Sequence, residues 1–163
     1  MMVEQYEIME EGALMRVYLD NCCFNRPYDD QSQLRISIET QAKLYIQREI
    51  TEGKLELVTS YVLLAENSAN TVEQKKQNIK KFIDENTHIF VSTSNKNAIE
   101  DKAKKIMEQG IKFLDACHVA SAIYADCDYF ISTDKRLLKY HTDEIVLINP
   151  TGFVLEMDGG QDE

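Results

Sequence analysis

Four acidic residues stand where short apolar segments of this chain end or lead into a helix. They are Asp20 after residues 17–19, Glu66 within residues 62–66, Asp115 after residues 113–114 and Asp134 after residues 129–133. Carboxylates placed against core elements are costly unless a positive group meets them. If the fold brings all four together, a hard divalent cation with oxygen ligands would offset their repulsion most simply. The pattern therefore indicates metal-assisted hydrolysis of a phosphodiester.

Taken one at a time, each of these acids also has an ordinary structural explanation. Asp115 opens a predicted helix and could be its N-cap, Asp134 could cap a short helix beginning at Lys135, and Asp20 could be a turn residue that ends a strand. Glu66 is the most telling, because it lies on the apolar stripe of its predicted helix. Its structural alternative is a border residue half exposed to solvent. All four together at strand ends favour a shared function.

The rest of the chain alternates short strands with amphipathic helices. Strands are expected at 16–20, 55–58, 88–91, 129–132 and 145–148. Helices are expected from about residue 34 to Gly53, after an N-cap at Ser60, at 71–85, from an N-cap at Ser94 to Gly110, from Asp115, and at 135–140. This alternation predicts an α/β fold, a three-layer α/β/α sandwich with a mostly parallel central sheet. Such folds bind ligands at the carboxyl ends of their strands, where Asp20 and Asp134 fall.

Length and charge favour one domain with two acidic ends. A chain of 163 residues with 44% hydrophobic residues is large enough for a full core. We expect an acidic N-terminal tail at 1–14, a domain at 15–155 and an acidic flexible C-terminal tail at 156–163. Each tail carries -4 of the formal net charge of -10, which leaves -2 for residues 15–155. The acidity therefore does not exclude a nucleic-acid partner, although it predicts a modest grip on one.

The cysteines and the hydropathy pattern argue against a zinc site and a membrane segment. Cys22, Cys23, Cys117 and Cys127 form no C-x-x-C pair and no Cys/His spacing typical of zinc, so we expect reduced, mostly buried thiols. No basic patch precedes an apolar stretch near the N-terminus, and no run approaches the roughly 18 apolar residues that span a bilayer. We expect a cytoplasmic protein with no membrane partner.

Four segments of the chain resemble, in order, the acidic motifs of the PIN domain superfamily. They are Tyr-Leu-Asp-Asn at 18–21, residues 60–66, Lys-Phe-Leu-Asp-Ala-Cys-His-Val-Ala at 112–120 and Asp-Tyr-Phe-Ile-Ser-Thr-Asp at 128–134. The most specific part is the D-A-x-H-x-A helix followed by the S-T-D strand end. The resemblance covers about residues 15–150 and is greatest to the small bacterial PIN proteins of the VapC toxin kind.

That resemblance implies an active site, a cofactor and partners. The catalytic and metal-binding residues would be Asp20, Glu66, Asp115 and Asp134, supported by Asn21, Ser132 and Thr133. The cofactor would be Mg²⁺ or Mn²⁺, which polarises the scissile phosphate and activates a water for in-line attack that leaves a 5′-phosphate and a 3′-hydroxyl. The partners would be single-stranded or structured RNA, an antitoxin protein and a second copy of the chain in a homodimer.

Several residues near these motifs have two interpretations. Four basic residues flank the carboxylates and could contact phosphates, or could equally be exposed solubilising charge: Arg26, Lys112, Lys135 and Arg136. His118 lies one turn after Asp115, and we expect a packed core histidine rather than a group that reaches the metal. Asp126 occupies a turn where such proteins often have Gly, and Asp tolerates the left-handed conformation better than most residues.

The leading hypothesis is a divalent-metal-dependent endoribonuclease that is the toxin of a type II toxin–antitoxin pair. One alternative is a catalytically weak PIN-fold module that binds RNA or regulates a partner. The segment 21–27 differs from the small polar residues that commonly follow the first acid in toxins, and this difference argues against a toxin role more than against the nuclease site. A phosphorylation-regulated α/β receiver ranks last, since its acidic pair near the first strand and its late lysine are not evident.

Overall fold

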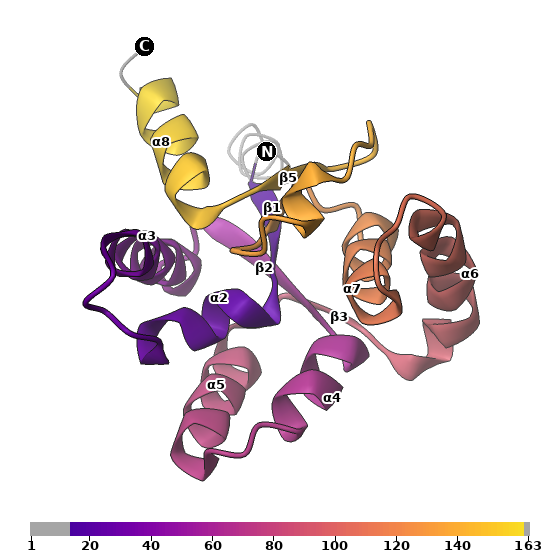
Figure 1. Cartoon of the computed structure of the whole chain (residues 1–163), viewed down its shortest axis with the longest axis horizontal. Coiled ribbons are helices and arrows are strands. Elements are labelled where there is room, and N and C mark those ends of the chain that lie inside the picture. The colour runs from indigo at the N-terminus through magenta and orange to yellow at the C-terminus, as the bar shows by residue number, and fades with distance from the viewer. Residues whose placement is uncertain (1–13, 162–163) are drawn as a thin grey trace, which may run out of the picture.

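The computed structural model describes residues 14–161, in which one β-sheet lies between two groups of helices (Figure 1). Its strands are β1 (Met15–Leu19), β2 (Leu55–Ser60), β3 (Ile89–Val91), β4 (Tyr129–Ile131) and β5 (Val146–Ile148). Its helices are α2 (Asn21–Asn25), α3 (Leu34–Thr51), α4 (Tyr61–Ser68), α5 (Glu73–Asn86), α6 (Lys96–Met107), α7 (Phe113–Tyr124) and α8 (Pro150–Gln161). Short 3-10 turns lie at Arg26–Tyr28, Thr93–Asn95 and Leu137–Lys139.

The strand order is β3-β2-β1-β4-β5, and every neighbouring pair is parallel. The predicted α/β/α fold is therefore confirmed, with a sheet that is wholly parallel in the described residues. From the central strand β1 the chain moves outward to β2 and β3, then returns to place β4 on the other side of β1. The carboxyl ends of β1 and β4 thus flank the point where the winding direction reverses, which is where open α/β sheets bind their ligands.

Two apolar cores cover the two faces of the sheet. Alternate strand residues point to opposite faces, so Tyr18 and Phe130 pack towards α6 and α7 while Val17 and Leu57 pack towards α3, α5 and α8. The rings of Tyr18 and Phe130 stack with centroids 5.4 Å apart. Helix α4 contributes Val62 to one core and Leu63 to the other, and this fixes its rotation after the carboxyl end of β2.

Several helix and turn positions follow from local chemistry, as the sequence predicts. The hydroxyl of Ser60 accepts a hydrogen bond from the Leu63 N–H at 3.2 Å and caps α4. Gly53 and Gly110 follow α3 and α6 with φ of 77° and 90°. Asp126 has φ of 56°, the left-handed conformation expected for the turn after α7.

Two predicted helix caps are wrong. Ser94 lies in a 3-10 turn and its hydroxyl pairs with that of Ser92 at 2.6 Å, so it does not cap α6. Helix α7 begins two residues before Asp115, with Lys112 in the N-cap position, so Asp115 lies in the first turn and is not the cap. The five-residue helix α2 was not expected, because such a short segment shows no periodicity.

Helix α8 differs most from the sequence-based expectation. It continues to Gln161, so residues 156–161 are helical where a flexible tail was expected. Tertiary packing anchors this helix, since Phe153 is buried and its ring meets that of Tyr129 edge-on at 5.0 Å. Its glycines have low helix propensity and conceal it in the sequence.

The expected N-terminal tail at 1–14 lies outside the described residues apart from Leu14. Within residues 14–161, no helix combines the length and the apolar character needed to cross a bilayer.

Candidate metal centre

Asp20 is the first acid of the site, and its carboxylate is held on both sides. It follows β1 and is nearly buried. The Asn21 N–H donates to its Oδ1 at 2.8 Å, and the Ser132 hydroxyl donates to its Oδ2 at 2.8 Å. The Cys22 thiol also lies 3.4 Å from Oδ2. The end of β4 therefore orients the acid that ends β1.

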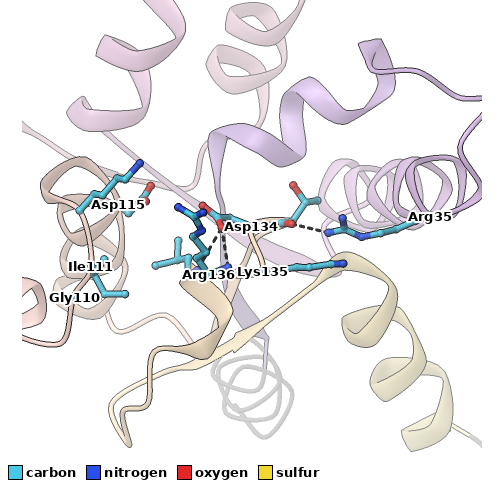
Figure 2. A pocket seen from close by; sticks show the side chains of 10 residues that line it. Arg35, Gly110, Ile111, Asp115, Asp134, Lys135 and Arg136 are labelled. Carbon is cyan, nitrogen blue, oxygen red and sulfur yellow. Dashed lines mark hydrogen bonds between the residues drawn. The ribbon is translucent and has the colours of Figure 1, made fainter.

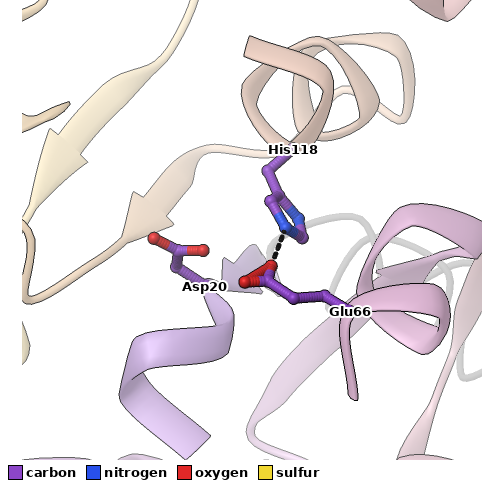
Figure 3. A group of neighbouring side chains, drawn as sticks. All are labelled: Asp20, Glu66 and His118. Carbon is purple, nitrogen blue, oxygen red and sulfur yellow. Dashed lines mark hydrogen bonds and ion pairs between the residues drawn. The ribbon is translucent and has the colours of Figure 1, made fainter. Parts of the chain in front are cut away.

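Glu66 approaches Asp20 from α4 and is hydrogen-bonded to His118 of α7 (Figure 3). His118 Nε2 lies 2.6 Å from Glu66 Oε1. One ligand atom from each of Asp20, Glu66 and His118 lies within 4.8 Å of the other two, a separation that a single ion could bridge. The Glu66 side chain is 28% exposed, so this carboxylate lies at the boundary between the core and the open site.

His118 itself is fully buried, as expected for a packed core histidine. Its other ring nitrogen, Nδ1, lies 2.7 Å from the Tyr18 hydroxyl. Burial alone would lower the pKa of His118, but the hydrogen bond to Glu66 and the charges of Asp20, Glu66 and Asp115 outweigh it and raise that pKa. Its proximity to two of the acids is the contact that the sequence analysis missed. The three-residue spacing after Asp115, which places both side chains on one helix face, was the available signal.

Asp115 and Asp134 lie next to this group but outside its tightest part. Burial and then the negative charges of Asp20 and Asp134 raise the pKa of Asp115. Asp134 Oδ1 accepts the backbone N–H of Arg136 at 2.9 Å, just before the 3-10 turn at Leu137–Lys139, and Arg136 rather than Asp134 is in the N-cap position of that turn. The structure thus brings the four predicted acids to one end of the sheet, while the closest cluster is Asp20, Glu66 and His118.

None of these four carboxylates forms an ion pair with Lys or Arg in residues 14–161, where the one titratable group in direct contact with them is His118 on Glu66. The donors are mainly carboxylate oxygens, which suit hard cations such as Mg²⁺ and Mn²⁺, and the buried Asn21 Oδ1 has no hydrogen-bond partner in the described chain. The residues present therefore fit a divalent cation, held by Asp20 and Glu66 with Asp115 and Asp134 beside them.

A pocket of about 530 Å³ opens beside Asp115 and Asp134 (Figure 2). It is lined by basic side chains from three parts of the chain: Arg35, Lys112, Lys135 and Arg136. Acidic and basic groups in one open pocket can hold a cation and a phosphate next to each other. Three of the four basic residues considered from sequence therefore face this pocket, and Arg35 of α3 was not predicted.

Arg26, the fourth of these residues, has a structural partner. Its guanidinium forms ion pairs with Asp29 at 2.9 Å and Glu39 at 3.1 Å, and its side chain is 14% exposed. We therefore correct its assignment as a phosphate contact, because its donors already serve two carboxylates. Arg35 also reaches Glu39 at 3.5 Å and donates to the Thr133 carbonyl oxygen at 3.0 Å, which ties α3 to the rim of the site.

The remaining supporting residues lie at the ends of β1 and β4. Ser132 is buried and connects Asp20 to Asp134. Its hydroxyl donates to the Asp20 carboxylate and also accepts the Asp134 N–H at 3.0 Å. Thr133 is nearly buried, and its N–H lies 3.3 Å from the Cys22 sulfur. All four cysteines are free thiols, and only Cys22 is partly exposed. The thiols are thus mostly buried, as the sequence predicts.

Comparison with known proteins assigns the family. A model of the PIN domain matches residues 17–142, which is most of the chain. The chain belongs to the PIN domain family. PIN domains are typically metal-dependent nucleases, and the carboxylate cluster of this PIN domain is placed at the sheet end where ligands bind in such folds.

A solved structure supports the same fold. This PIN domain is similar to a chain in the crystal structure of VapBC2 from Rickettsia felis bound to a DNA fragment from their promoter, with a TM-score of 0.55 and 14% identity. The match covers 83% of this chain and 98% of the other. At this identity the similarity concerns the fold. No curated protein matches the sequence significantly.

Proposed function

We propose that this PIN domain is a divalent-metal-dependent endoribonuclease. The observation that carries the proposal is the cluster of Asp20, Glu66, Asp115 and Asp134 at one end of the sheet, with no Lys or Arg paired to it in the described residues. Membership of the PIN family supports it, since such a cluster is typical of metal-dependent nucleases. The substrate class, RNA, comes from the VapC-like motif pattern.

The residues of this chain have distinct tasks in the proposed reaction. A bound Mg²⁺ or Mn²⁺ would supply a Lewis acid for the phosphate and lower the pKa of a water. Asp20 and Glu66 would hold the cation, with Ser132 fixing the orientation of Asp20. Asp115 and Asp134 would complete the ligand set directly or through water. Lys112, Lys135 and Arg136 would hold the RNA phosphates along the adjoining pocket.

A cleavage assay with matched variants tests this proposal. The wild-type protein should cut single-stranded or structured RNA when Mg²⁺ or Mn²⁺ is added, and a chelator should stop it. Asp20→Asn and Asp115→Asn should lower the rate at least about 100-fold, since each removes a charge that the cation requires. Asp84→Asn is the control, because it changes an exposed carboxylate on α5 with the same chemistry.

The outcome separates the enzyme from the alternative of a catalytically weak RNA-binding module. Cleavage that persists without metal and in both site variants would reject the proposal. RNA binding with no cleavage at saturating metal would support the alternative. Circular dichroism of every variant should match the wild type, so that loss of activity is not loss of fold.

We further propose that the protein acts as the toxin of a type II toxin–antitoxin pair and binds an antitoxin protein. Fold similarity to a chain of the VapBC2 complex supports this role. Expression of the wild type in a bacterial host should arrest growth, and Asp20→Asn should relieve the arrest. Unimpaired growth at high expression of active nuclease would contradict the toxin role and leave the nuclease assignment standing. The predicted homodimer remains a prediction, which light scattering of the purified protein would decide.

A further inference from the structure

A continuous series of hydrogen bonds connects the start of α4 to Glu66 near its end, through β1 and α7. The Leu63 N–H donates to Ser60 Oγ at 3.2 Å. Ser60 Oγ lies 2.7 Å from the Tyr18 hydroxyl, and this hydroxyl lies 2.7 Å from His118 Nδ1. His118 Nε2 lies 2.6 Å from Glu66 Oε1, the contact drawn in Figure 3. Five residues thus form one path through the core.

Because the side chains in the middle of this path are completely buried, each of their donors must find an acceptor within the protein. Tyr18, Ser60 and His118 each have an exposed fraction of 0%. Solvent therefore does not supply a partner to any of their polar atoms, and a buried donor without an acceptor costs about 1–3 kcal/mol. The arrangement of protons that satisfies every donor is accordingly strongly preferred.

One arrangement satisfies all of them. The backbone N–H of Leu63 can only donate, so Ser60 Oγ accepts there and is free to donate its own proton to the Tyr18 oxygen. Tyr18 then donates its proton to His118 Nδ1, which must be the unprotonated nitrogen of a neutral ring. The proton of that ring is on Nε2 and is donated to the Glu66 carboxylate, which can only accept. Each bond has one donor and one acceptor.

A doubly protonated ring breaks this arrangement. With a proton on Nδ1, Tyr18 would have to accept from His118 and donate to Ser60. Ser60 Oγ would then accept twice, from Tyr18 and from the Leu63 N–H, and its own proton would have no acceptor in the described residues. The opposite tautomer, with Nδ1–H alone, would set the unprotonated Nε2 against the carboxylate. Of the two neutral forms of the ring, the Nε2–H tautomer is therefore the one that the surroundings select.

We propose that Ser60 and Tyr18 fix His118 as the neutral Nε2–H tautomer, and that His118 thereby positions the Glu66 carboxylate for the cation. This inference rests on the proposed function. It makes His118 a positioning residue and not a metal ligand, even though its ring lies within the tightest group of potential ligands. Glu66 Oε1 accepts the ring proton, which leaves Oε2 to face the cation. Partners of this kind around a metal ligand commonly change metal affinity 10–100-fold.

The chemistry of the tyrosine suits this task. Burial raises the pKa of Tyr18 well above its ordinary range, so its hydroxyl keeps its proton and remains a donor to His118. Its ring is also fixed by stacking on Phe130, with an interplanar angle of 11°. The donor atom therefore has little freedom to leave Nδ1.

Nuclear magnetic resonance tests the tautomer without any enzymatic assay. In the metal-free, ¹⁵N-labelled protein at mildly alkaline pH, a long-range ¹H–¹⁵N spectrum should show His118 with a protonated Nε2 and an unprotonated Nδ1. The His118→Gln variant assigns the signal among the three histidines of the chain. Tyr18→Phe should weaken the single-tautomer pattern, because the ring loses the donor to Nδ1 and keeps only the contact of Nε2 with Glu66, while the packing of the aromatic ring is kept.

A second tyrosine provides the matched control. Tyr61 is partly buried on α4, and its hydroxyl has no hydrogen-bond partner in the described residues. Tyr61→Phe therefore removes the same atom outside the chain of hydrogen bonds. In calorimetric titrations with Mn²⁺, Tyr18→Phe should bind about tenfold more weakly than the wild type, and Tyr61→Phe should bind with unchanged affinity.

Two variants of the histidine provide the same test if Tyr18→Phe does not fold. The amide of His118→Gln can still donate to Glu66, whereas His118→Leu cannot. Affinity for Mn²⁺ should therefore fall less in the Gln variant than in the Leu variant. Equal affinities in the two would contradict a positioning role.

The outcomes separate this inference from the proposed function. If the wild type binds Mn²⁺ but Tyr18→Phe keeps both the tautomer pattern and the affinity, the inference is overturned and the nuclease proposal stands. Disappearance of the Nε2–H signal on adding Mg²⁺ would show that the ring ligates the metal, which also overturns it. If the wild type binds no metal, the proposed function fails and so does the role of His118 towards a cation.

Discussion

Buried or half-buried carboxylates in two regions of this protein differ in whether an arginine pairs with them. Glu39 on α3 is 4% exposed at its side chain, and two guanidinium groups meet it, those of Arg26 at 3.1 Å and Arg35 at 3.5 Å. Asp20, Glu66, Asp115 and Asp134 gather at the end of the sheet and have no such partner in the described residues. An acid already neutralised by arginine is part of the scaffold. A cluster left without a cation is suited to bind one from solution.

The same contrast explains the correction for Arg26. Sequence proximity to the first acid made it a candidate for phosphate binding, yet its guanidinium is used within the fold. The basic residues that line the site pocket have no comparable buried partner among the described residues, apart from Arg35, which serves both regions. Substitutions in the Glu39 ion pairs should therefore lower stability, whereas substitutions of the acids at the end of the sheet should lower activity.

The largest expected effect on stability comes from Arg26→Met. It removes the closer of the two partners of the buried Glu39 and should lower the free energy of unfolding by about 3 kcal/mol, since Arg35 at 3.5 Å compensates that buried charge only in part. Urea denaturation measures this. The exposed pair of Lys80 and Asp84 on α5 provides the control, and Lys80→Met should cost less than about 0.5 kcal/mol. A similar small loss in both variants would show that the Glu39 ion pairs are not structural.

Lys43 provides a buried cation with no ion pair in the described residues, and it should give a smaller effect that depends on pH. Burial lowers its pKa from 10.5 to about 8. The unfolded chain then binds more protons than the folded one between these two values, so the contribution of Lys43 to stability rises with pH across that window. At about 1.4 kcal/mol per pKa unit, the rise is of the order of 3 kcal/mol at most.

The measurement for Lys43 is the difference between the wild type and Lys43→Met in urea denaturation at several pH values. Taking the difference removes the contributions of other groups that titrate at alkaline pH. The wild type should gain stability relative to the variant from pH 8 upward. A difference that stays constant with pH would show that the ammonium group is solvated in the folded protein.

The smallest expected effect on stability is at Asp115, where the substitution should stabilise the protein rather than destabilise it. Burial and the charges of Asp20 and Asp134 raise the pKa of Asp115, so its ionised form destabilises the metal-free fold at neutral pH. Asp115→Asn should therefore raise the melting temperature of the metal-free protein. This gain should shrink as the pH falls through the raised pKa, because the wild-type carboxyl then becomes neutral as well. Thermal denaturation in the presence of a chelator measures both points, and a lowered melting temperature at neutral pH would contradict the repulsion.

Local chemistry made much of the fold predictable. Ser60 caps α4 through a hydrogen bond within a few residues. Gly53 after α3 and Asp126 after α7 adopt the left-handed conformation, which depends on the residue type at that position. The alternation of strands and helices was sufficient for the α/β/α fold. The four acids were identified because their positions at strand ends and on an apolar helix stripe are visible in one dimension.

Long-range packing determined what the sequence concealed. Helix α8 depends on the burial of Phe153 and not on helix propensity. The burial of Glu39 and Lys43 on α3 has no signal in the spacing of apolar residues, since Leu34 and Ile38 belong to that spacing and are exposed. The contact between Glu66 and His118 joins residues 52 positions apart, and only the packing of α4 against α7 creates it.

The most direct test of the account is a calorimetric titration of Mn²⁺ into the wild type, Asp20→Asn and Asp84→Asn. The unpaired carboxylates predict one site that the wild type and Asp84→Asn share and that Asp20→Asn loses. Equal binding in all three proteins, or none in the wild type, would contradict the claim that the sheet-end acids hold a divalent cation.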